Sequence, residues 1–377
     1  MVEIREVLSR GDLKKFVTYP NKLYRDVPQY MPPLVSDDMA DWNRKSNPAF
    51  AYCEARCWLA LRDGEIVGRI GAILSHKANE KWNTRRMRFT QVDFIDDAEV
   101  SEALFRTVEN WAREKQCDEV HGPLGFTDLD REGMLIDGFD EKGMFITYYN
   151  HPYYLEHLAR LGYAKDVDWV EFLIDVPGPN DPLSDKLNRL SERIQRMQKL
   201  HVAKVNRRRE YKPYIEQVFA LINTCYAHLY GTVDLTDAQI KKYADKFIPL
   251  INPELACFLM NEKEEMVGFA VSAPSIAEAS KKHGGRLFPI GFIDILRALK
   301  VNDTLDLFLI AMRPDYQNSA ANAILMNHVL KGCHKLGITK AETGPQLELN
   351  EKIQHQWNLF KYQNHKRRRC FVKRLEV

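Results

Sequence analysis

A chain of 377 residues with a mass of 43.9 kDa is longer than one compact hydrophobic core usually supports, so we expect about two domains. Hydrophobic residues make up 45% of the chain and charged residues 28%, which excludes a largely disordered protein. Fifty-four Lys and Arg against 52 Asp and Glu leave a formal charge of +2, and this balance argues against a dedicated nucleic-acid binder.

The longest apolar runs are far shorter than the roughly 18 residues that a membrane span needs, and the first residues lack the apolar stretch of a secretory signal. The seven cysteines form no Cys-x-x-Cys pair, and no His or Cys spacing typical of a metal site occurs. The motifs of zincins, α/β-hydrolases and P-loop NTPases are also missing from the sequence. We therefore expect a cytoplasmic protein that holds no metal.

In chain order, the first half predicts a β-hairpin over 57–68, where two apolar runs flank a polar turn. A strand over 89–95, an amphipathic helix over 100–115 and a second strand over 117–121 follow, and that strand ends at Gly122-Pro123. Apolar residues recur in the helix at i, i+3 and i+4 spacing, so we expect this stripe to face the core.

The second half repeats this order. A hairpin over 257–268 lies 200 residues after the first hairpin, and a strand over 305–312, a helix over 320–334 and a strand over 338–343 follow, ending at Gly344-Pro345. The shared order predicts two copies of one α/β (α+β layered) unit, in which helices cover a sheet.

A run that neither helix nor strand tolerates separates the two halves, because three prolines and a glycine fall between Val176 and Pro182. We therefore predict an N-terminal domain over 1–178 and a C-terminal domain over 179–377.

Two further segments have an unusual composition. The second half holds about 22 residues more than the first between hairpin and strand, and the insertion falls within 275–301. Its apolar part, 285–299, predicts a lid or wall over an apolar cleft and a weak peripheral membrane contact, or else simple packing on the second core. The four basic residues of 366–369 are interpreted as a solvated strand or loop face, with a phosphate or lipid headgroup contact as the alternative.

The repeated order of elements resembles the GCN5-related N-acetyltransferase (GNAT) fold in tandem. The blocks over 133–140 and 149–155 are more specific, and with 285–292 and 347–350 they resemble the bacterial ceramide synthase-like family of GNAT proteins. This resemblance implies an acyltransferase that uses acyl-CoA or acetyl-CoA as co-substrate. It implies transfer to an amine acceptor such as a sphingoid or other lipid-like amine, with no nucleic acid involved.

In the GNAT fold the pyrophosphate of CoA binds backbone N–H groups at the start of the core helix, which is a natural anion site. The resemblance therefore assigns cofactor binding to the second half, where Gln317 matches the family pattern, Ala320 replaces its central glycine and Asn322 its last small residue. We expect Ala320 to take helical dihedrals. The implied set is Ala311, Met312, Gln317, Asn318, Ser319, Ala320, Ala321 and Asn322.

The helix start of the first half excludes such a site. Asp96, Asp97 and Glu99 place three carboxylates where the pyrophosphate would lie. Unit charges ~4 Å apart repel by about 4 kcal/mol at an effective dielectric constant near 20. We expect no CoA in the first half.

Aminolysis of a thioester needs a donor to the developing oxyanion, a base for the amine and a proton for the leaving thiolate. The resemblance places the oxyanion donor on the backbone near Ala311 or Met312. We expect Glu348 to be the base with Asn350 orienting it, although a carboxylate there also suits a helix N-terminus. Tyr362, which we place on the last helix, is the candidate proton donor, with core packing as its alternative.

Three residues of the first half lie in the family-specific blocks, and we expect them to line an acceptor cleft between the halves: Asp130, Tyr149 and Tyr153. Two other functions stay open at this point. One is an N-acetyltransferase acting on a small amine or a peptide. The other is a non-catalytic GNAT-fold protein that binds acyl-CoA or a partner.

Overall fold

The computed structural model describes residues 1–376, which divide into two compact units. Unit 1 comprises residues 1–170, 277–292 and the described residues from 365 on, and unit 2 comprises 171–276 and 293–364. The first break falls a little before the division at 178 that the sequence predicts, and two later segments are grouped with unit 1. Within residues 1–376, no helix combines the length and the apolarity that crossing a membrane requires.

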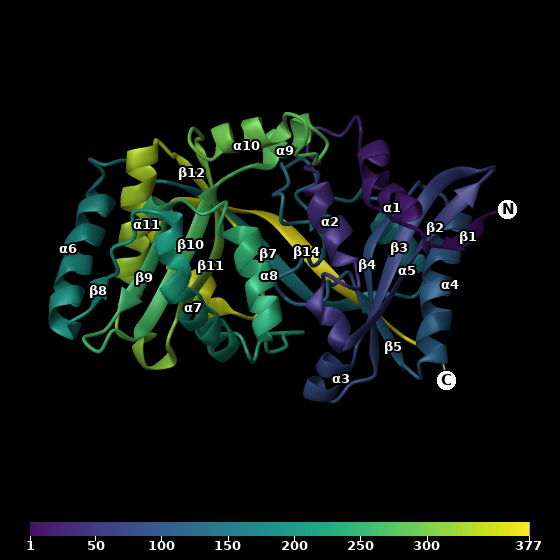
Figure 1. Cartoon of the computed structure of the whole chain (residues 1–377), viewed down its shortest axis with the longest axis horizontal. Coiled ribbons are helices and arrows are strands. Elements are labelled where there is room, and N and C mark those ends of the chain that lie inside the picture. The colour runs from purple at the N-terminus through teal and green to yellow at the C-terminus, as the bar shows by residue number, and fades with distance from the viewer. Residues whose placement is uncertain (377) are drawn as a thin grey trace. The chain divides into compact units, whose positions relative to one another are not determined.

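Unit 1 is built on a sheet whose strands follow the order β1-β2-β3-β4-β5-β14 (Figure 1). Its strands are β1 (Glu3–Glu6), β2 (Cys53–Arg62), β3 (Glu65–Ser75), β4 (Arg86–Phe94), β5 (Glu119–Gly122), β6 (Met134–Asp137) and β14 (Tyr362–Arg374). Its helices are α1 (Arg10–Leu23), α2 (Val35–Asp41), α3 (His76–Trp82), α4 (Ala98–Glu114), α5 (Tyr154–Arg160) and α9 (Ala277–Lys282). The long strand β7 (Ala164–Asp175) crosses the break at residue 170, and β14 crosses the break at residue 364, so its first three residues belong to unit 2.

Unit 2 has a sheet with the order β12-β11-β10-β9-β8, and the end of β7 pairs with β12. Its strands are β8 (His201–Val202), β9 (Ala256–Met260), β10 (Met266–Pro274), β11 (Thr304–Met312), β12 (Lys340–Thr343) and β13 (Gln346–Leu347). Its helices are α6 (Pro182–Gln198), α7 (Lys212–Cys225), α8 (Asp237–Phe247), α11 (Asn322–Leu336) and α12 (Glu351–His355), and α10 (Gly291–Ala298) begins at the edge of unit 1.

The local sequence explains the first hairpin and its helix. Asp63 and Gly64 both have a positive φ, which is what a two-residue hairpin turn needs to match the twist of its strands. The apolar stripe of α4, including Val100, Leu104 and Val108, is completely buried against the sheet. The predicted hairpin and core helix are therefore confirmed.

The strand register shows that the two units repeat the same arrangement of strands. Gly68 on β3 pairs with Phe94 on β4, and Gly268 on β10 pairs with Met312 on β11. One residue further, Ile95 N–H donates to Val67 O at 3.1 Å, and Arg313 N–H donates to Val267 O at 2.8 Å. Phe94 and Met312 thus occupy equivalent positions, and the tandem repeat that the sequence predicts is confirmed.

In each unit the two parallel strands that flank the core helix are paired over only a few residues and then diverge. β4 pairs with β5 only over 86–88 and then continues to Phe94, while β11 pairs with β12 only over 304–307 and then continues to Met312. The last residues of β4 and β11 therefore have one edge without a neighbouring strand. In each unit this unpaired edge leads into the core helix, α4 or α11.

Candidate functional site

The free edge of β11 ends in a main-chain donor at Met312. Hydrogen bonds alternate in an antiparallel ladder, and Arg313 N–H bonds to β10, so the N–H of Ala311 also faces β10 and that of Met312 faces the open edge. Met312 O on the same edge accepts from Gln317 Nε2 at 3.0 Å and from Cys225 Sγ at 3.4 Å. Within the described chain we find no acceptor for Met312 N–H. Of the two candidate oxyanion donors, only the N–H of Met312 is directed away from β10.

The same position in unit 1 is fully occupied. Phe94 N–H donates to Tyr154 Oη at 2.7 Å, and Phe94 O accepts from Tyr153 Oη at 2.5 Å. Tyr154 is completely buried, and its hydroxyl also lies 2.9 Å from that of Tyr24. Burial raises the pKa of Tyr154 well above its usual value, so the ring stays neutral. In unit 1 a side chain therefore takes up the N–H at this position. On the edge of unit 2, the side chains of Gln317, Cys225 and Tyr226 bond to carbonyl groups, at Met312 O and Ile310 O.

Replacing Tyr154 by Phe is expected to lower the free energy of unfolding by about 1–2 kcal/mol, because the buried Phe94 N–H loses its acceptor. Tyr19→Phe is the matched control, since the buried Tyr19 hydroxyl has no hydrogen-bond partner among the described residues and its loss should cost nothing. Urea denaturation of both variants measures the difference. Equal stability of the two variants would show that the Tyr154 hydroxyl does not hold this edge.

The starts of α4 and α11 differ in the same way, because side chains occupy the first and, among the described residues, no side chain caps the second. Asp97 caps α4 by accepting from Val100 N–H at 3.1 Å, and Arg62 bonds to both Asp97, at 2.8 Å, and Glu99, at 2.8 Å. The hydrogen bond from Arg62 lowers the pKa of Asp97 to about 2. Asp96 Oδ1 accepts a hydrogen bond from His157 Nε2 at 2.9 Å. The Arg62 guanidinium offsets part of the repulsion that these carboxylates would exert on a pyrophosphate. The start of α4 is nevertheless occupied by side chains.

No side chain caps the start of α11 among the described residues. The turn before it is held by Ser319 Oγ, which donates to Tyr316 O at 2.7 Å, and by Gln198 Nε2, which donates to Ser319 O at 2.7 Å. Gln317, Asn318 and Ala320 are exposed in this turn. The first N–H groups of a helix carry its positive end, and at α11 no side-chain cap among the described residues takes them up, as Asp97 does at α4.

Two neighbours refine this helix start. Asn322 Nδ2 donates to Gln356 Oε1 at 2.9 Å, so the side-chain amide of Asn322 already has one partner within unit 2. Gln356 Nε2 is a buried donor without a partner in the part of the chain described. Ala321 is completely buried against the core of unit 2, so a charged substitution there would test packing and not ligand binding.

Ala320 does not take the helical dihedrals that we expected. Its φ is +59°, in the left-handed region that glycine adopts without strain and that costs other residues about 1–2 kcal/mol. Ala320 lies between the 3₁₀ turn Pro314–Tyr316 and the first residue of α11. Its backbone therefore has a conformation that glycine would adopt without strain.

Ala320→Gly is expected to raise the free energy of unfolding by about 0.5–1 kcal/mol, because relief of left-handed strain outweighs the added freedom of the unfolded chain. Ala220→Gly, at an exposed position in the interior of α7, is expected to lower it by about 1 kcal/mol. Thermal unfolding of both variants gives the comparison. A loss of stability in Ala320→Gly would contradict the strain.

Glu348 and Asn350 lie on the turn between β13 and α12. Gln354 Nε2 donates to Leu347 O at 2.9 Å and to Glu348 O at 3.1 Å, and Asn350 N–H donates to Leu347 O at 2.9 Å. Glu348 is half-buried. The turn follows β12, the strand that pairs with β11 over 304–307, and the short strand β13.

Tyr362 is not on the last helix. The helical segment ends with the 3₁₀ turn Gln356–Leu359, and Tyr362 is the first residue of β14. Its hydroxyl donates to Asn358 Oδ1 at 2.9 Å, and its ring packs edge-on against Phe172 at 5.3 Å. The predicted helix is wrong here because β5 and β6 draw the following residues into the sheet.

The three candidate acceptor residues belong to unit 1. Asp130 Oδ2 accepts from the N–H groups of Phe126 at 2.9 Å and Thr127 at 3.2 Å, which closes a tight loop. Tyr153 bonds to β4 as described above, and Tyr149 packs edge-on against Tyr24 at 5.4 Å. The contacts of Asp130 and Tyr153 are those of residues that hold unit 1 together.

The sequence did not predict that two further carboxylates of this loop, those of Asp128 and Glu132, have raised pKa values. Burial raises the pKa of Asp128 to about 6, and burial together with the charge of Asp128 raises the pKa of Glu132 well above its usual value. The alternation of Asp128, Asp130 and Glu132 in the sequence does not indicate raised pKa values, because the burial of a loop cannot be inferred from its sequence.

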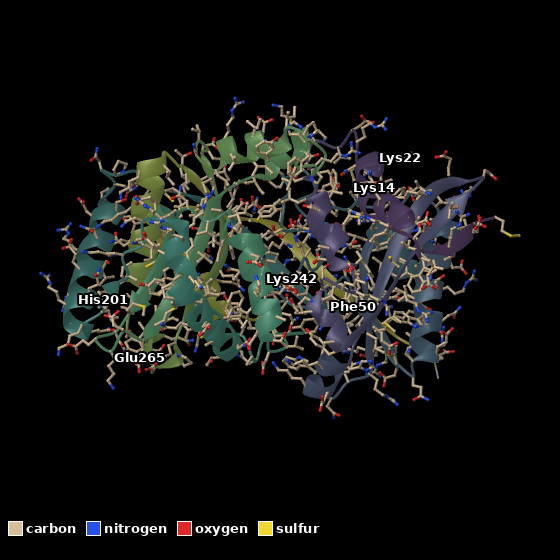
Figure 2. The ribbon with its side chains drawn as sticks, viewed as in Figure 1. Lys14, Lys22, Phe50, His201, Lys242 and Glu265 are labelled. Atoms are coloured by element: carbon tan, nitrogen blue, oxygen red, sulfur yellow. The ribbon has the colours of Figure 1, made fainter. Side chains whose placement is uncertain are left out.

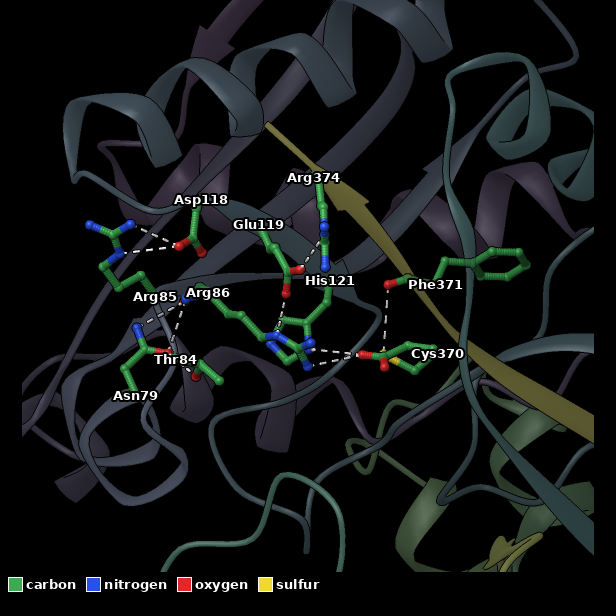
Figure 3. Close-up of polar contacts among 11 residues, drawn as sticks. Asn79, Thr84, Arg85, Arg86, Asp118, Glu119, His121, Cys370, Phe371 and Arg374 are labelled. Carbon is green, nitrogen blue, oxygen red and sulfur yellow. Dashed lines mark hydrogen bonds and ion pairs between the residues drawn. The ribbon is translucent and has the colours of Figure 1, made fainter. Parts of the chain in front are cut away.

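His121, Asp166 and Cys370 bring three possible metal-ligand atoms within 4.8 Å of one another. Arg86 already binds Asp166 Oδ2 at 3.1 Å and Glu119 at 2.6 Å, and His121 Nδ1 lies 3.8 Å from the same Asp166 oxygen (Figure 3). A cation would compete with the Arg86 guanidinium for that oxygen. We assign this cluster to the stability of unit 1.

No family model matches the sequence. A solved tandem GNAT protein from the clavulanic acid biosynthesis pathway aligns with 100% of this chain and 99% of its own, with a TM-score of 0.58 at 13% identity. The repeat of the two hairpins, strands and core helices agrees with that match. The chain is a tandem GNAT-fold protein.

Two curated proteins resemble this tandem GNAT-fold protein in sequence over most of their length. Protein YghO of Escherichia coli K12 is 28% identical over 326 residues, which is 85% of this chain and 81% of YghO. The bacterial ceramide synthase of Caulobacter vibrioides is 25% identical over 356 residues, which is 93% of this chain and 91% of that protein.

Proposed function

We propose that the protein is an N-acyltransferase that moves an acyl group from acyl-CoA to an amine, and that unit 2 alone holds the CoA. The observation that carries this proposal is the contrast at two equivalent positions. Phe94 N–H is bonded to Tyr154, whereas Met312 N–H faces an open edge. Likewise α4 starts on a cap and an arginine, whereas α11 starts uncapped after a left-handed Ala320.

We further propose a sphingoid or other lipid-like amine as the acceptor. The support is the similarity, over nearly the whole chain, to a protein named bacterial ceramide synthase. Asp130, Tyr149 and Tyr153 remain candidates for acceptor contacts, although the hydrogen bonds of Asp130 and Tyr153 within unit 1 give each of them a structural role as well.

The residues of unit 2 divide the chemistry among them. Acyl-CoA supplies an acyl carbon activated as a thioester. The N–H groups of Gln317 and Ser319 already donate to Pro314 O and Tyr316 O, so other N–H groups of the turn 317–322, at the positive end of α11, hold the pyrophosphate, and the Gln317 side chain braces the turn on Met312 O. Met312 N–H donates to the acyl oxygen as negative charge develops there.

Proton transfer completes the reaction. Glu348 takes a proton from the amine as its nitrogen bonds to the acyl carbon and the carbon–sulfur bond breaks. Asn350 orients the turn that carries Glu348, and the Tyr362 hydroxyl supplies the proton for the departing thiolate. The products are an amide and CoA, and no metal takes part in this scheme.

An acceptor screen tests the proposal. The purified protein is incubated with acetyl-CoA or a long-chain acyl-CoA and with sphingoid bases, small polar amines or peptides, and thiol release and product mass are recorded. The proposal expects amide formation from long-chain acyl-CoA and a lipid-like amine. Transfer confined to acetyl groups and small amines or peptides would favour an N-acetyltransferase, and no thiol release with any pair would favour a non-catalytic binding protein.

A further inference from the structure

The structure exposes apolar side chains in one short segment. Five of the 13 large hydrophobic residues that are exposed in the described chain fall within residues 288–296: Phe288, Ile290, Phe292, Ile293 and Leu296. Phe288 is 78% exposed, and its ring lies 5.8 Å from that of Phe292. Exposed apolar groups that cluster in this way mark a binding surface, whereas scattered ones do not.

Helix α10 turns its apolar residues in two directions. Gly291, Ile295 and Leu299 are buried, and their spacing of four residues defines the side that packs on the protein. Phe292, Ile293 and Leu296 lie on the opposite side and are exposed. An ordinary surface helix presents polar residues on that side, so packing within this chain does not explain the sequence of α10.

The segment before α10 is anchored by directed bonds to unit 1. Ser280 Oγ donates to Pro32 O at 2.7 Å, Asn21 Nδ2 donates to Gly284 O at 2.9 Å, and Val35 N–H donates to Gly285 O at 3.0 Å. Packing on the second core, which is the alternative for 285–299, is therefore wrong for residues 285–292. The anchored segment leads directly into the exposed residues of α10, shown in green in Figure 1.

The same segment is basic. Residues 277–301 contain five Lys and Arg against two acidic residues, a net charge of +3, although the whole chain carries only +2. Arg286, Arg297 and Lys300 are exposed beside the apolar side chains. The combination of protruding Phe, Ile and Leu with flanking basic residues is typical of helices that lie in the interface of an anionic bilayer. The core of a protein–protein interface is instead depleted of charge.

We propose that α10 and the residues before it dock on the surface of an anionic lipid membrane, with Phe288, Phe292 and Leu296 entering the headgroup region and Arg286 and Lys300 contacting lipid phosphates. This inference stands apart from the proposed catalysis, because membrane docking is measured without turnover.

Flotation of the full-length protein with vesicles tests the docking. We expect the protein to float with vesicles of phosphatidylcholine containing about one third phosphatidylglycerol, and to float weakly with phosphatidylcholine alone. The double variant Phe288→Ser/Phe292→Ser should lose at least tenfold in partition. Arg286→Gln/Lys300→Gln should lose about fivefold for each charge removed on the anionic vesicles only.

Matched controls lie elsewhere on the surface. Leu8→Ser removes an apolar side chain that is 84% exposed, and Lys14→Gln removes an exposed charge on α1 (Figure 2), and neither should change partition. Circular dichroism and size-exclusion chromatography confirm the fold of each variant. Absence of flotation in the wild type, or equal flotation of the wild type and the Phe288/Phe292 variant, would overturn the proposal. So would a change in oligomeric mass as the only effect of that variant.

Discussion

Replacing Glu348 by Gln is expected to lower kcat at least 100-fold and to leave the KM for acyl-CoA nearly unchanged. A general base of this kind contributes about 10²- to 10⁴-fold, and glutamine keeps the shape of the side chain but cannot accept the proton of the amine. Steady-state kinetics with the acceptor found in the screen measures both constants.

Glu351→Gln separates this role from helix stabilisation. Glu351 is exposed and lies in the first turn of α12, where its carboxylate interacts favourably with the positive end of the helix. It therefore has the helix-stabilising role that is the alternative for Glu348. We expect Glu351→Gln to leave kcat unchanged. Equal and small losses in the two variants would assign Glu348 to the helix and remove it from the chemistry.

A second large effect concerns acid stability and His121. Burial, with smaller contributions from Arg88 and Arg86, lowers the pKa of His121 to about 4, while the unfolded chain titrates near 6.5. Because the folded pKa lies below the unfolded one, the unfolded state binds a proton first as the pH falls. Stability from the neutral ring is thus present above pH 6.5 and declines between pH 6.5 and 4. The loss is about 2 kcal/mol by pH 5 and about 3 kcal/mol by pH 4.

His121→Gln isolates that titration from the others. Asp128 and Glu132 have raised pKa values and act in the opposite direction, so the wild type alone would not reveal the histidine. Urea denaturation at pH 7, 5 and 4 should show a smaller decline of unfolding free energy in the variant. Parallel curves for the two proteins would mean that His121 keeps its proton equilibrium on folding.

The features that could be predicted from the sequence are those that local pattern decides. Alternating apolar residues around Asp63-Gly64 specify the first hairpin, and the stripe of α4 specifies which side faces the core. The 200-residue offset between Gly68 and Gly268 carries over into an identical register beside Phe94 and Met312.

Other features depend on distant partners and were missed. The basic residues of 366–369 are not a solvated face: Lys366 and Arg368 are almost completely buried, and Arg369 bonds to Asp168 at 2.7 Å. Tyr362 joins a strand because other strands pair with β14. The left-handed backbone of Ala320 follows from the path of the chain into α11 and not from its side chain.

The measurement that tests the central claim most directly is calorimetry of CoA and of a long-chain acyl-CoA with three forms of the protein: wild type, Asn318→Glu and Glu99→Gln. Asn318 is exposed in the turn before α11, so a carboxylate there adds charge beside the proposed phosphate site without disturbing the core. Glu99, paired with Arg62, belongs to the capped start of α4. We predict that the wild type and Glu99→Gln bind equally and that Asn318→Glu binds at least tenfold more weakly, a loss of about 1.4 kcal/mol. Binding that weakens in Glu99→Gln and not in Asn318→Glu, or no binding of any CoA species at millimolar concentration, would contradict the assignment of the CoA site to unit 2.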